Sequence, residues 1–415
     1  MIIKPQGMLD FFPEDTEKIQ YIESTARSVA ERFGFGEIRT PVLESTELFS
    51  RGVGNTTDVV QKEMYTFNDR DGQSYSLKPE GTAGVVRAIL ESGKYGDAMP
   101  LKYYYITNCY RHEKPQKGRY REFSQFGVEM FGSQSPVADA TVISMADMII
   151  KSLNIGKVEL RINSIGCPKC RPNYHKLLRE YFEDKKDALC ATCRSRLETN
   201  PMRILDCKSE ECKKVSANAP KSIDCLCEEC KTHFETLKGY LEASGIKYET
   251  DTSIVRGLDY YTKTVFEFVC SDENMGSQST ICGGGRYDGL VEELGGNYLP
   301  ACGFGMGITR LLPTVKLPEK KNGAKLYIAT MGQKATATAV SAVGKLREIG
   351  IHAENDTVGR SLKAQMKYAD KISAEYVIIL GDNEIESGKA TMKRMSDSTQ
   401  SEIEIDKITE IIKTL

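Results

Sequence analysis

Residues 109–132 read CYRHEKPQKGRYREFSQFGVEMFG, and this stretch decides how the first part of the chain is interpreted. Strand-like runs lie on either side of a short loop of Lys, Gln, Pro and Gly, which predicts a β-hairpin. Five Lys or Arg and a single acid fall between Arg111 and Arg121, although the whole chain has a formal net charge of −2. Phosphate suits such a hairpin, because the planar fork of Arg fits two phosphate oxygens at once. A solubilising hairpin tip explains the loop charges equally well, so the rest of the sequence has to decide.

The bulk composition limits the class of protein. A chain of 415 residues predicts two or three domains, since single cores usually stop growing near about 250 to 300 residues. No run approaches the ~18 apolar residues of a membrane span, and the N-terminus lacks a signal-like apolar segment. We therefore expect a cytoplasmic protein with no membrane partner. The nearly balanced charge argues against coating nucleic acid by bulk charge and leaves room for a local basic groove.

The pattern of the first 322 residues mixes helices with strands that are joined mainly by hairpins. Apolar residues at helical spacing predict a first helix from Pro13 to about Gly34 and another over about 136–153. The extended run EIRTPVLE contains Pro41, and a proline favours an edge or irregular strand. The pattern predicts an α+β domain built on a mainly antiparallel sheet with flanking helices.

The pattern changes from about Lys325. Strands and helices alternate there at βαβαβ spacing, two short strands follow, and a helix ends the chain. This alternation predicts a separate small α/β domain over 323–415 with parallel strands, and the charged segment LPEKKNGAK is the expected linker.

A cysteine-rich insert of about 167–250 interrupts the first domain. Nine of the thirteen cysteines lie between positions 167 and 230. In a reducing compartment, cysteine pairs at short spacing are more often metal ligands than disulfides, although disulfides or free thiols stay open as alternatives. Four pairs suffice for two tetrahedral zinc sites and leave Cys225 over: Cys167/Cys170, Cys190/Cys193, Cys207/Cys212 and Cys227/Cys230.

Two further motifs point to an anion beside an amino group. PEGT at 79–82 places Glu80 and Thr82 at a strand-to-helix turn, where they could receive an ammonium group; ordinary helix-start chemistry explains them too. In IVRGLDYYTKTVFEF, 254–268, Arg256 lies beside two tyrosines and directly before a strand. A buried Arg is costly unless it meets an anion.

Two glycine-rich stretches follow, ICGGGRYDGLV at 281–291 and ACGFGMGITRLL at 301–312. Neither contains GxGxxG, and the chain has no P-loop, so a nucleotide would have to be held by another design. Glycines that alternate along a strand suit the close approach of a flat ligand or of another backbone. Arg310 lies about one helical turn beyond Gly307 and could reach a phosphate.

Together and in this order, the motifs resemble the histidyl-tRNA synthetases, a family of class II aminoacyl-tRNA synthetases. The run around Pro41 resembles motif 1, RHEKPQKGRYREF motif 2 and GFGMGITRLL motif 3, whereas VRGLDYYTKTVFEF and GGGRYDGLV resemble signatures of the histidine enzymes. The resemblance implies that ATP and histidine give histidyl-adenylate and pyrophosphate, and that histidine then passes to the 3′ end of histidine tRNA. It also implies Mg²⁺ with the ATP, a homodimer formed through motif 1, and an anticodon-binding function for residues 323–415.

The resemblance implies a role for particular residues. Arg111 and Arg256 would act in catalysis at the α-phosphate, Arg310 would hold the distal phosphate and the adenine, and Arg119 would add a phosphate contact. Glu80 and Thr82 would hold the α-amino group with Gln125 nearby; Glu129 and Tyr261 would read the imidazole. The implied histidine-binding set is Glu80, Thr82, Arg111, Gln125, Glu129, Arg256, Tyr260 and Tyr261. Lys114 and Gln116 would contact tRNA at the hairpin tip, where Lys offers a point charge instead of the fork of Arg.

Two other functions remain as alternatives. A regulatory paralogue of this fold would bind histidine without charging tRNA, but it would lack the last domain and the arginines of motifs 2 and 3. A zinc-ribbon module that binds nucleic acid would account for the insert and would leave Arg256, Tyr261 and Glu129 without a purpose.

Overall fold

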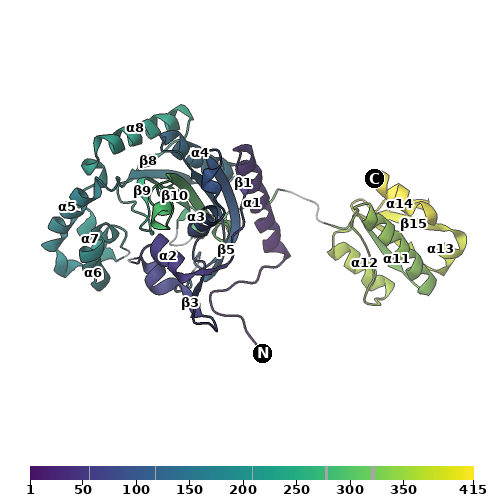
Figure 1. Cartoon of the computed structure of the whole chain (residues 1–415). Coiled ribbons are helices and arrows are strands. Elements are labelled where there is room, and N and C mark those ends of the chain that lie inside the picture. The colour runs from purple at the N-terminus through teal and green to yellow at the C-terminus, as the bar shows by residue number, and fades with distance from the viewer. Residues whose placement is uncertain (56, 117, 208, 276–278, 319–322) are drawn as a thin grey trace. The chain divides into compact units, whose positions relative to one another are not determined.

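The computed structural model describes the chain except for residues 56, 117, 208, 276–278 and 319–322. The chain divides into two compact units, Met1–Leu317 and Pro318–Leu415, which are described separately (Figure 1). The boundary expected between residues 322 and 323 falls at the edge of a segment outside the described residues.

An eight-stranded sheet organises the first unit. Its interior strands pair antiparallel, and only the two-residue edge strands run parallel to their neighbours. The expected mainly antiparallel sheet is therefore confirmed. In spatial order the strands are β1 (Gly36–Glu37), β5 (Leu101–Tyr110), β6 (Glu122–Phe131), β11 (Ala301–Gly307), β10 (Thr280–Arg286), β9 (Thr262–Cys270), β7 (Val158–Ser164) and β8 (Glu249–Thr250).

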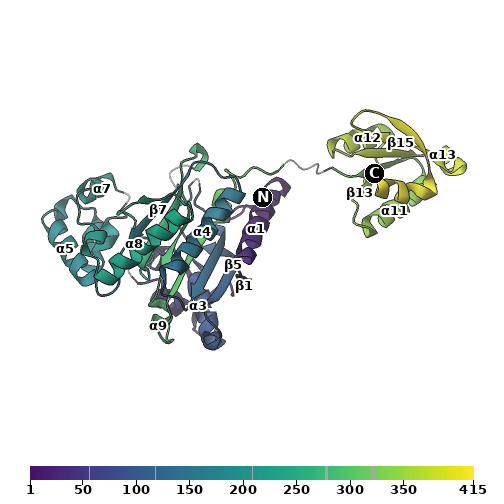
Figure 2. The same cartoon turned by 90° about the horizontal axis from the view of Figure 1, so that it is seen from above.

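Helices α1 (Pro13–Arg32), α4 (Pro136–Ser152) and α8 (Glu228–Ala243) lie side by side over one face of this sheet (Figure 2). Pro at the first turn of α1 and α4 favours helix initiation, and Ser135 caps α4 by accepting the N–H of Val137 at 3.3 Å. Their apolar stripes bury against the strands and form the largest core.

Side chains along β6 alternate between that core and the opposite face of the sheet. Phe126, Val128 and Met130 belong to the core under the helices. Glu129 instead hydrogen-bonds side chains of the second core, and Gln125 lines a cleft. Because successive side chains of a strand point to opposite faces, the same hairpin supplies both the core and the polar surface.

Shorter elements cover the polar face. A three-stranded sheet lies there, and α3 begins two residues after Glu80. Pro41 lies between β1 and β2, outside both strands. These elements are β2 (Leu43–Ser45), β4 (Ser74–Leu77), β3 (Tyr65–Asn68), α2 (Thr46–Gly52), η1 (Val59–Glu63), α3 (Thr82–Glu91), η2 (Lys94–Gly96) and α9 (Leu290–Glu293). The short elements η6 (Glu273–Met275) and α10 (Ile308–Leu311) instead add Met275, Ile308 and Leu311 to the core under the helices.

The cysteine-rich insert is helical, and its short helices group together at one end of the unit (Figure 1). They pack on a core that includes Tyr174, Leu178 and Phe182. Before α8 the insert contains α5 (Arg171–Glu183), η3 (Lys186–Ala188), α6 (Ala191–Thr199), η4 (Pro201–Ile204), α7 (Glu210–Ser216) and η5 (Ser222–Cys225).

The second unit is an α/β sandwich around a five-stranded sheet. Its first three strands are parallel, as the alternating pattern predicted, and the last two are antiparallel. The strand order is β13 (Ala353–Asn355), β12 (Leu326–Thr330), β14 (Tyr376–Leu380), β15 (Lys389–Arg394) and β16 (Gln400–Glu404). The helices are α11 (Gln333–Glu348), α12 (Leu362–Lys371), α13 (Asp382–Ser387), η7 (Ile405–Lys407) and α14 (Ile408–Thr414). Among the described residues of the whole chain, no helix is both long and apolar enough to cross a membrane.

Candidate active site

A cleft of about 340 Å³ opens on the polar face of the large sheet. Four arginines from three separate segments line it, namely Arg111, Arg119, Arg256 and Arg310. The structure therefore brings together the cations that the motifs had placed far apart in the sequence.

Arg111 and Arg119 come from the two sides of the β5–β6 hairpin. The Arg111 Nε donates to the carbonyl of Pro79 at 2.9 Å, and its guanidinium lies 5.5 Å from the ring centre of Phe123. Arg119 forms an ion pair of 2.6 Å with Glu113. Both guanidinium groups are held before any ligand arrives, which is how a pre-organised anion site works.

Arg256 has an unusual backbone and a crowded side chain. Its φ of 61° is left-handed, a conformation that is costly for a residue with a Cβ. The guanidinium pairs with Glu267 and lies 5.7 Å from the ring centre of Tyr261. A Cβ at Gly283 would collide with this guanidinium, so glycine at that position makes room for Arg256.

Arg310 links the last strand of the site to the hairpin. It donates to the carbonyl of Gly118 at 3.2 Å and to that of Thr280 at 2.6 Å. Burial lowers its pKa to about 10, and the charges of Arg119 and Arg111 act in the same direction. A buried cation that other cations oppose is a mark of a site that receives an anion.

Glu129 is the centre of a buried cluster of polar side chains with Thr82, Tyr105 and Tyr287, which we call the slot. Its side chain is 1% exposed, and it accepts hydrogen bonds from Thr82 at 2.7 Å, from Tyr105 at 3.1 Å and from Tyr287. Burial raises the pKa of this carboxyl to about 8, despite those hydrogen bonds. The slot can therefore exchange a proton close to neutral pH.

Glu80 occupies the start of α3. Its carboxylate accepts the backbone N–H of Thr82 at 2.7 Å and that of Ala83 at 2.9 Å, and its pKa is raised by burial. The helix-start explanation of PEGT thus has direct support. Each carboxylate oxygen still has a lone pair for a further donor, so the cap does not use up the acceptor capacity.

Tyr260 and Tyr261 form the aromatic wall of the slot. Their ring centres are 4.7 Å apart, and Tyr260 meets Tyr287 edge-on at 5.5 Å. Burial raises the pKa of Tyr261, so its phenol stays protonated and can act as a donor or acceptor. The slot and the cleft meet where Arg256 lies over Tyr261.

The other predicted site residues lie either in the cleft or on the exposed hairpin. Gln125 lines the cleft with the arginines. Lys114 and Gln116 are exposed on the hairpin, away from the slot. Three partners had not been singled out from the sequence: Tyr105, Tyr287 and Glu267. Tyr287 lies within GGGRYDGLV and Glu267 within VRGLDYYTKTVFEF, so those motifs contained a signal, whereas Tyr105 lies in ordinary strand sequence.

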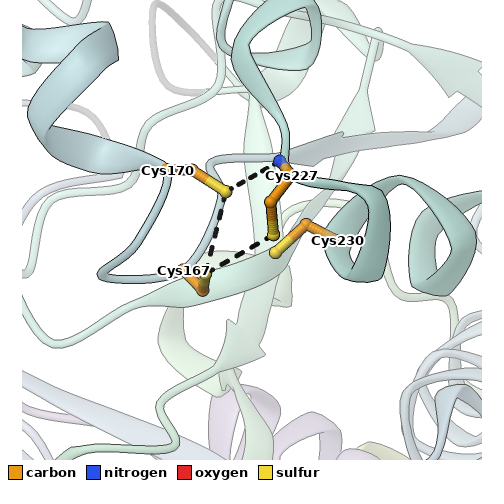
Figure 3. A group of neighbouring side chains, drawn as sticks. All are labelled: Cys167, Cys170, Cys227 and Cys230. Carbon is orange, nitrogen blue, oxygen red and sulfur yellow. Dashed lines mark hydrogen bonds between the residues drawn. The ribbon is translucent and has the colours of Figure 1, made fainter.

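The eight paired cysteines of the insert form two clusters. In each cluster one ligand atom per residue lies within 4.8 Å of every other one, and the two sets are Cys167, Cys170, Cys227 and Cys230, and Cys190, Cys193, Cys207 and Cys212. The four side chains of the first set point toward one another (Figure 3).

The sulfur spacing fits a tetrahedral metal. The Sγ of Cys167 lies 3.7 Å from that of Cys170 and 3.9 Å from that of Cys227. A tetrahedron of thiolates with Zn–S bonds of about 2.3 Å has S···S edges of about 3.8 Å. A disulfide would need about 2.05 Å, and every cysteine that the structure describes is free.

Comparison with known proteins gave matches over nearly the whole chain. The family model described as Histidyl-tRNA synthetase matches residues 7–311, and the one described as Anticodon binding domain matches residues 325–415. The Histidine–tRNA ligase of Acetivibrio thermocellus is 53% identical over 414 residues, which cover 99% of each chain. That of Caldanaerobacter subterraneus is 51% identical over 414 residues, again covering 99% of each.

Solved structures agree. The structure of apo histidyl-tRNA synthetase from S. aureus is 39% identical, with a TM-score of 0.84 and full coverage of both chains. A Bacillus halodurans structure described as an ATP phosphoribosyltransferase regulatory subunit/histidyl-tRNA synthetase shares the fold at 23% identity, with a TM-score of 0.65. It covers 92% of this chain and 98% of its own.

Proposed function

The chain belongs to the histidyl-tRNA synthetase family, and from this premise we propose that it is a histidine–tRNA ligase. It joins histidine to ATP as histidyl-adenylate, releases pyrophosphate, and then transfers histidine to the 3′ end of histidine tRNA. The observation that carries the proposal is the cleft of four arginines beside a buried polar slot.

In the first step a carboxylate oxygen of histidine attacks the α-phosphorus of ATP, and the bond from that phosphorus to the pyrophosphate oxygen breaks. Arg111 and Arg256 neutralise the negative charge on the α-phosphate, and Arg310 and Arg119 hold the phosphates beyond it. Fixed cations suit this chemistry, since the transition state needs charge stabilisation more than covalent help.

Mg²⁺ fits the cleft as a companion of ATP. Three acids line the cleft, and two of them, Glu113 and Glu267, are each paired with an arginine; the third is Asp206. The ion would therefore be held mainly by phosphates and water. When bound, it would neutralise charge on the leaving pyrophosphate.

The slot supplies the selectivity for histidine. Glu80 and Thr82 receive the α-amino group with Gln125 nearby, while Glu129 and Tyr261 hydrogen-bond the imidazole and Tyr260 packs against it. A side chain that cannot bond to Glu129 leaves part of the hydrogen-bonding capacity of a buried carboxyl unused, and sites built on such bonds reject analogues by roughly 10⁴-fold or more.

The exposed side chains of Lys114 and Gln116 suit a contact with the acceptor end of tRNA, and residues 323–415 suit the anticodon. We assign self-association to the segment around Pro41. Val42 and Leu43 are each 41% exposed there, an apolar pair that a second copy of the chain would cover. Sedimentation that gives a monomer at micromolar concentration would contradict the dimer.

Each cysteine cluster holds one structural zinc ion. The S···S distances and the burial of five of the eight sulfur residues support this assignment. Elemental analysis of the purified protein should find about two zinc ions per chain. Protein purified without zinc would contradict the assignment and would leave the proposed reaction untouched.

Pyrophosphate exchange with each of the twenty amino acids tests the function. Only histidine should support exchange, and Arg256→Ala should abolish it while tRNA binding persists. Arg32→Ala, an exposed change on α1, is the matched control and should keep exchange. Full exchange in Arg256→Ala would contradict the catalytic role, and histidine binding without any exchange in the unaltered protein would favour a regulatory paralogue.

A further inference from the structure

The segment from Arg256 to Lys263 forms one side of the histidine slot and has a strained backbone. It carries Arg256, Tyr260 and Tyr261 between two left-handed residues, with φ of 61° at Arg256 and 49° at Lys263. Neither end is a glycine, so both conformations cost free energy and persist only where neighbouring groups hold them. The residues that hold the two ends lie between or directly beside the cysteines of the two clusters.

At the Arg256 end, the contact is Arg203. This arginine is 7% exposed, donates to the carbonyl of Arg256 at 3.1 Å and to that of Gly257 at 2.5 Å, and bonds Asp259 at 3.2 Å. Arg203 lies on η4, between Cys193 and Cys207 of the second cluster.

The short elements around Arg203 depend on that cluster. The helix α6 has nine residues and α7 has seven, and isolated helices of that length are marginal in water. The Sγ of Cys212 on α7 accepts the N–H of Cys190 at the start of α6 at 3.3 Å. A metal ion bound by these cysteines would fix η4, and with it the three hydrogen bonds of Arg203.

At the Lys263 end, the contacts come from the first cluster. The backbone of Gly166, the residue before Cys167, accepts the N–H of Lys263 at 2.9 Å. The ammonium of Lys263 pairs at 2.8 Å with Glu229, which lies between Cys227 and Cys230. Arg171, the residue after Cys170, donates to the carbonyl of Tyr261.

We propose that the two metal-bound cysteine clusters are positioning devices for the histidine slot, clamping the Arg256 and Lys263 ends of the segment that forms its wall. This inference rests on the proposed function. It assigns the clusters a purpose in amino-acid activation, separate from tRNA contact. Arg203 and Arg171 are then positioning residues, since they act through the backbone of the residues that meet histidine.

The clamp predicts a larger effect on histidine than on ATP, because Arg256 is the one cleft arginine that the clamp holds. Arg111, Arg119 and Arg310 are held by Pro79, Glu113, Gly118 and Thr280, none of which belongs to the insert. Loss of a cluster should therefore raise the KM for histidine and lower kcat, while the affinity for ATP alone, which rests mainly on the other three arginines, changes less.

The test uses the full-length protein with Arg203→Ala, Cys207→Ser, Cys230→Ser and, as the matched control, Cys225→Ser. Cys225 is the insert cysteine outside both clusters. Zinc per chain, histidine-dependent pyrophosphate exchange and equilibrium binding of ATP without histidine are measured for each. Arg203→Ala should keep both zinc ions but lose exchange by about tenfold or more, because three hydrogen bonds from one buried guanidinium disappear.

Each cysteine variant should lose about one zinc ion and a similar factor in exchange, whereas Cys225→Ser should match the unaltered protein. ATP binding should stay within about threefold throughout, which also shows that the cleft is folded. Should a cysteine variant fail to fold, Arg203→Ala alone decides.

Three results would overturn the inference: unaltered protein that is active without zinc, a zinc-depleted cysteine variant with full exchange, or Arg203→Ala with an unchanged KM and kcat for histidine. Absence of exchange in the unaltered, zinc-loaded protein would instead contradict the proposed function, so the two failures are distinguishable.

Discussion

The buried carboxyl of Glu129 should make the stability of the first unit fall as pH rises. Burial raises the pKa of Glu129 from its usual value near 4.5 to about 8. Between these values the unfolded chain releases the proton and the native chain keeps it. The native state then binds more protons, so the free energy of unfolding decreases with pH. The contribution of Glu129 to the free energy of unfolding is fully present below pH 4.5 and is lost as pH rises through about 8.

The size of the effect follows from the span of the two pKa values. At about 1.4 kcal/mol per pH unit, three units from pH 5 to pH 8 correspond to about 4 kcal/mol. The side chain is only 1% exposed, so solvent does not screen this cost appreciably. For a unit of this size about 2 °C per kcal/mol gives a shift of about 8 °C in thermal midpoint.

The assay compares thermal midpoints of the unaltered protein and Glu129→Gln across pH 5 to 9. The amide keeps the shape of the side chain and cannot titrate, and groups that do not interact with Glu129 cancel in the difference between the two proteins. We expect the thermal midpoint of the variant, relative to that of the unaltered protein, to rise by about 8 °C between pH 5 and pH 8. Glu122→Gln, on the same strand and partly exposed, is the control. Parallel midpoint curves for Glu129→Gln would refute the reasoning.

Three further changes test other parts of the site. Arg310→Ala should raise the KM for ATP by about tenfold or more because a buried cation of the cleft is removed, and steady-state exchange that shows an unchanged KM would contradict this role. Arg286→Met should destabilise the first unit by about 3 to 5 kcal/mol, since it leaves the buried carboxylate of Asp139 without its ion pair; calorimetry that finds an unaltered midpoint would count against it. Gly303→Ala should weaken histidine binding, because the added Cβ would meet the Glu129 carboxylate, and titration calorimetry with an unaltered histidine affinity would disprove that crowding.

Local sequence patterns predicted those parts of the fold that local forces determine. The helix expected over about 136–153 is α4, Pro136–Ser152, because a Ser cap, a proline at the first turn and an apolar stripe all act within a few residues. The hairpin was predictable for the same reason, since β5 and β6 are adjacent in sequence and a short turn joins them.

The environment of Glu129 was not predictable in this way. Tyr287 reaches it from the end of β10, more than 150 residues along the chain, and no periodicity records which distant strands become neighbours. The glycines of β10 and β11 had suggested space for a flat ligand or for another backbone. At Gly283 and Gly303 the protein's own Arg256 and Glu129 occupy the space instead.

Arg203 illustrates a third kind of limit. Its sequence context, NPMRILDC, has no feature that distinguishes it from a surface arginine. Its importance depends on a single loop conformation, the left-handed backbone at Arg256, which appears only when the whole unit is folded.

The hydrogen bond from Arg310 to the carbonyl of Gly118 connects the arginine cleft to the β5–β6 hairpin. One guanidinium both lines the cleft and tethers the hairpin that carries Lys114 and Gln116. We expect a ligand that displaces this guanidinium to release the hairpin as well, so that occupancy of the cleft and the position of the hairpin are coupled through one side chain.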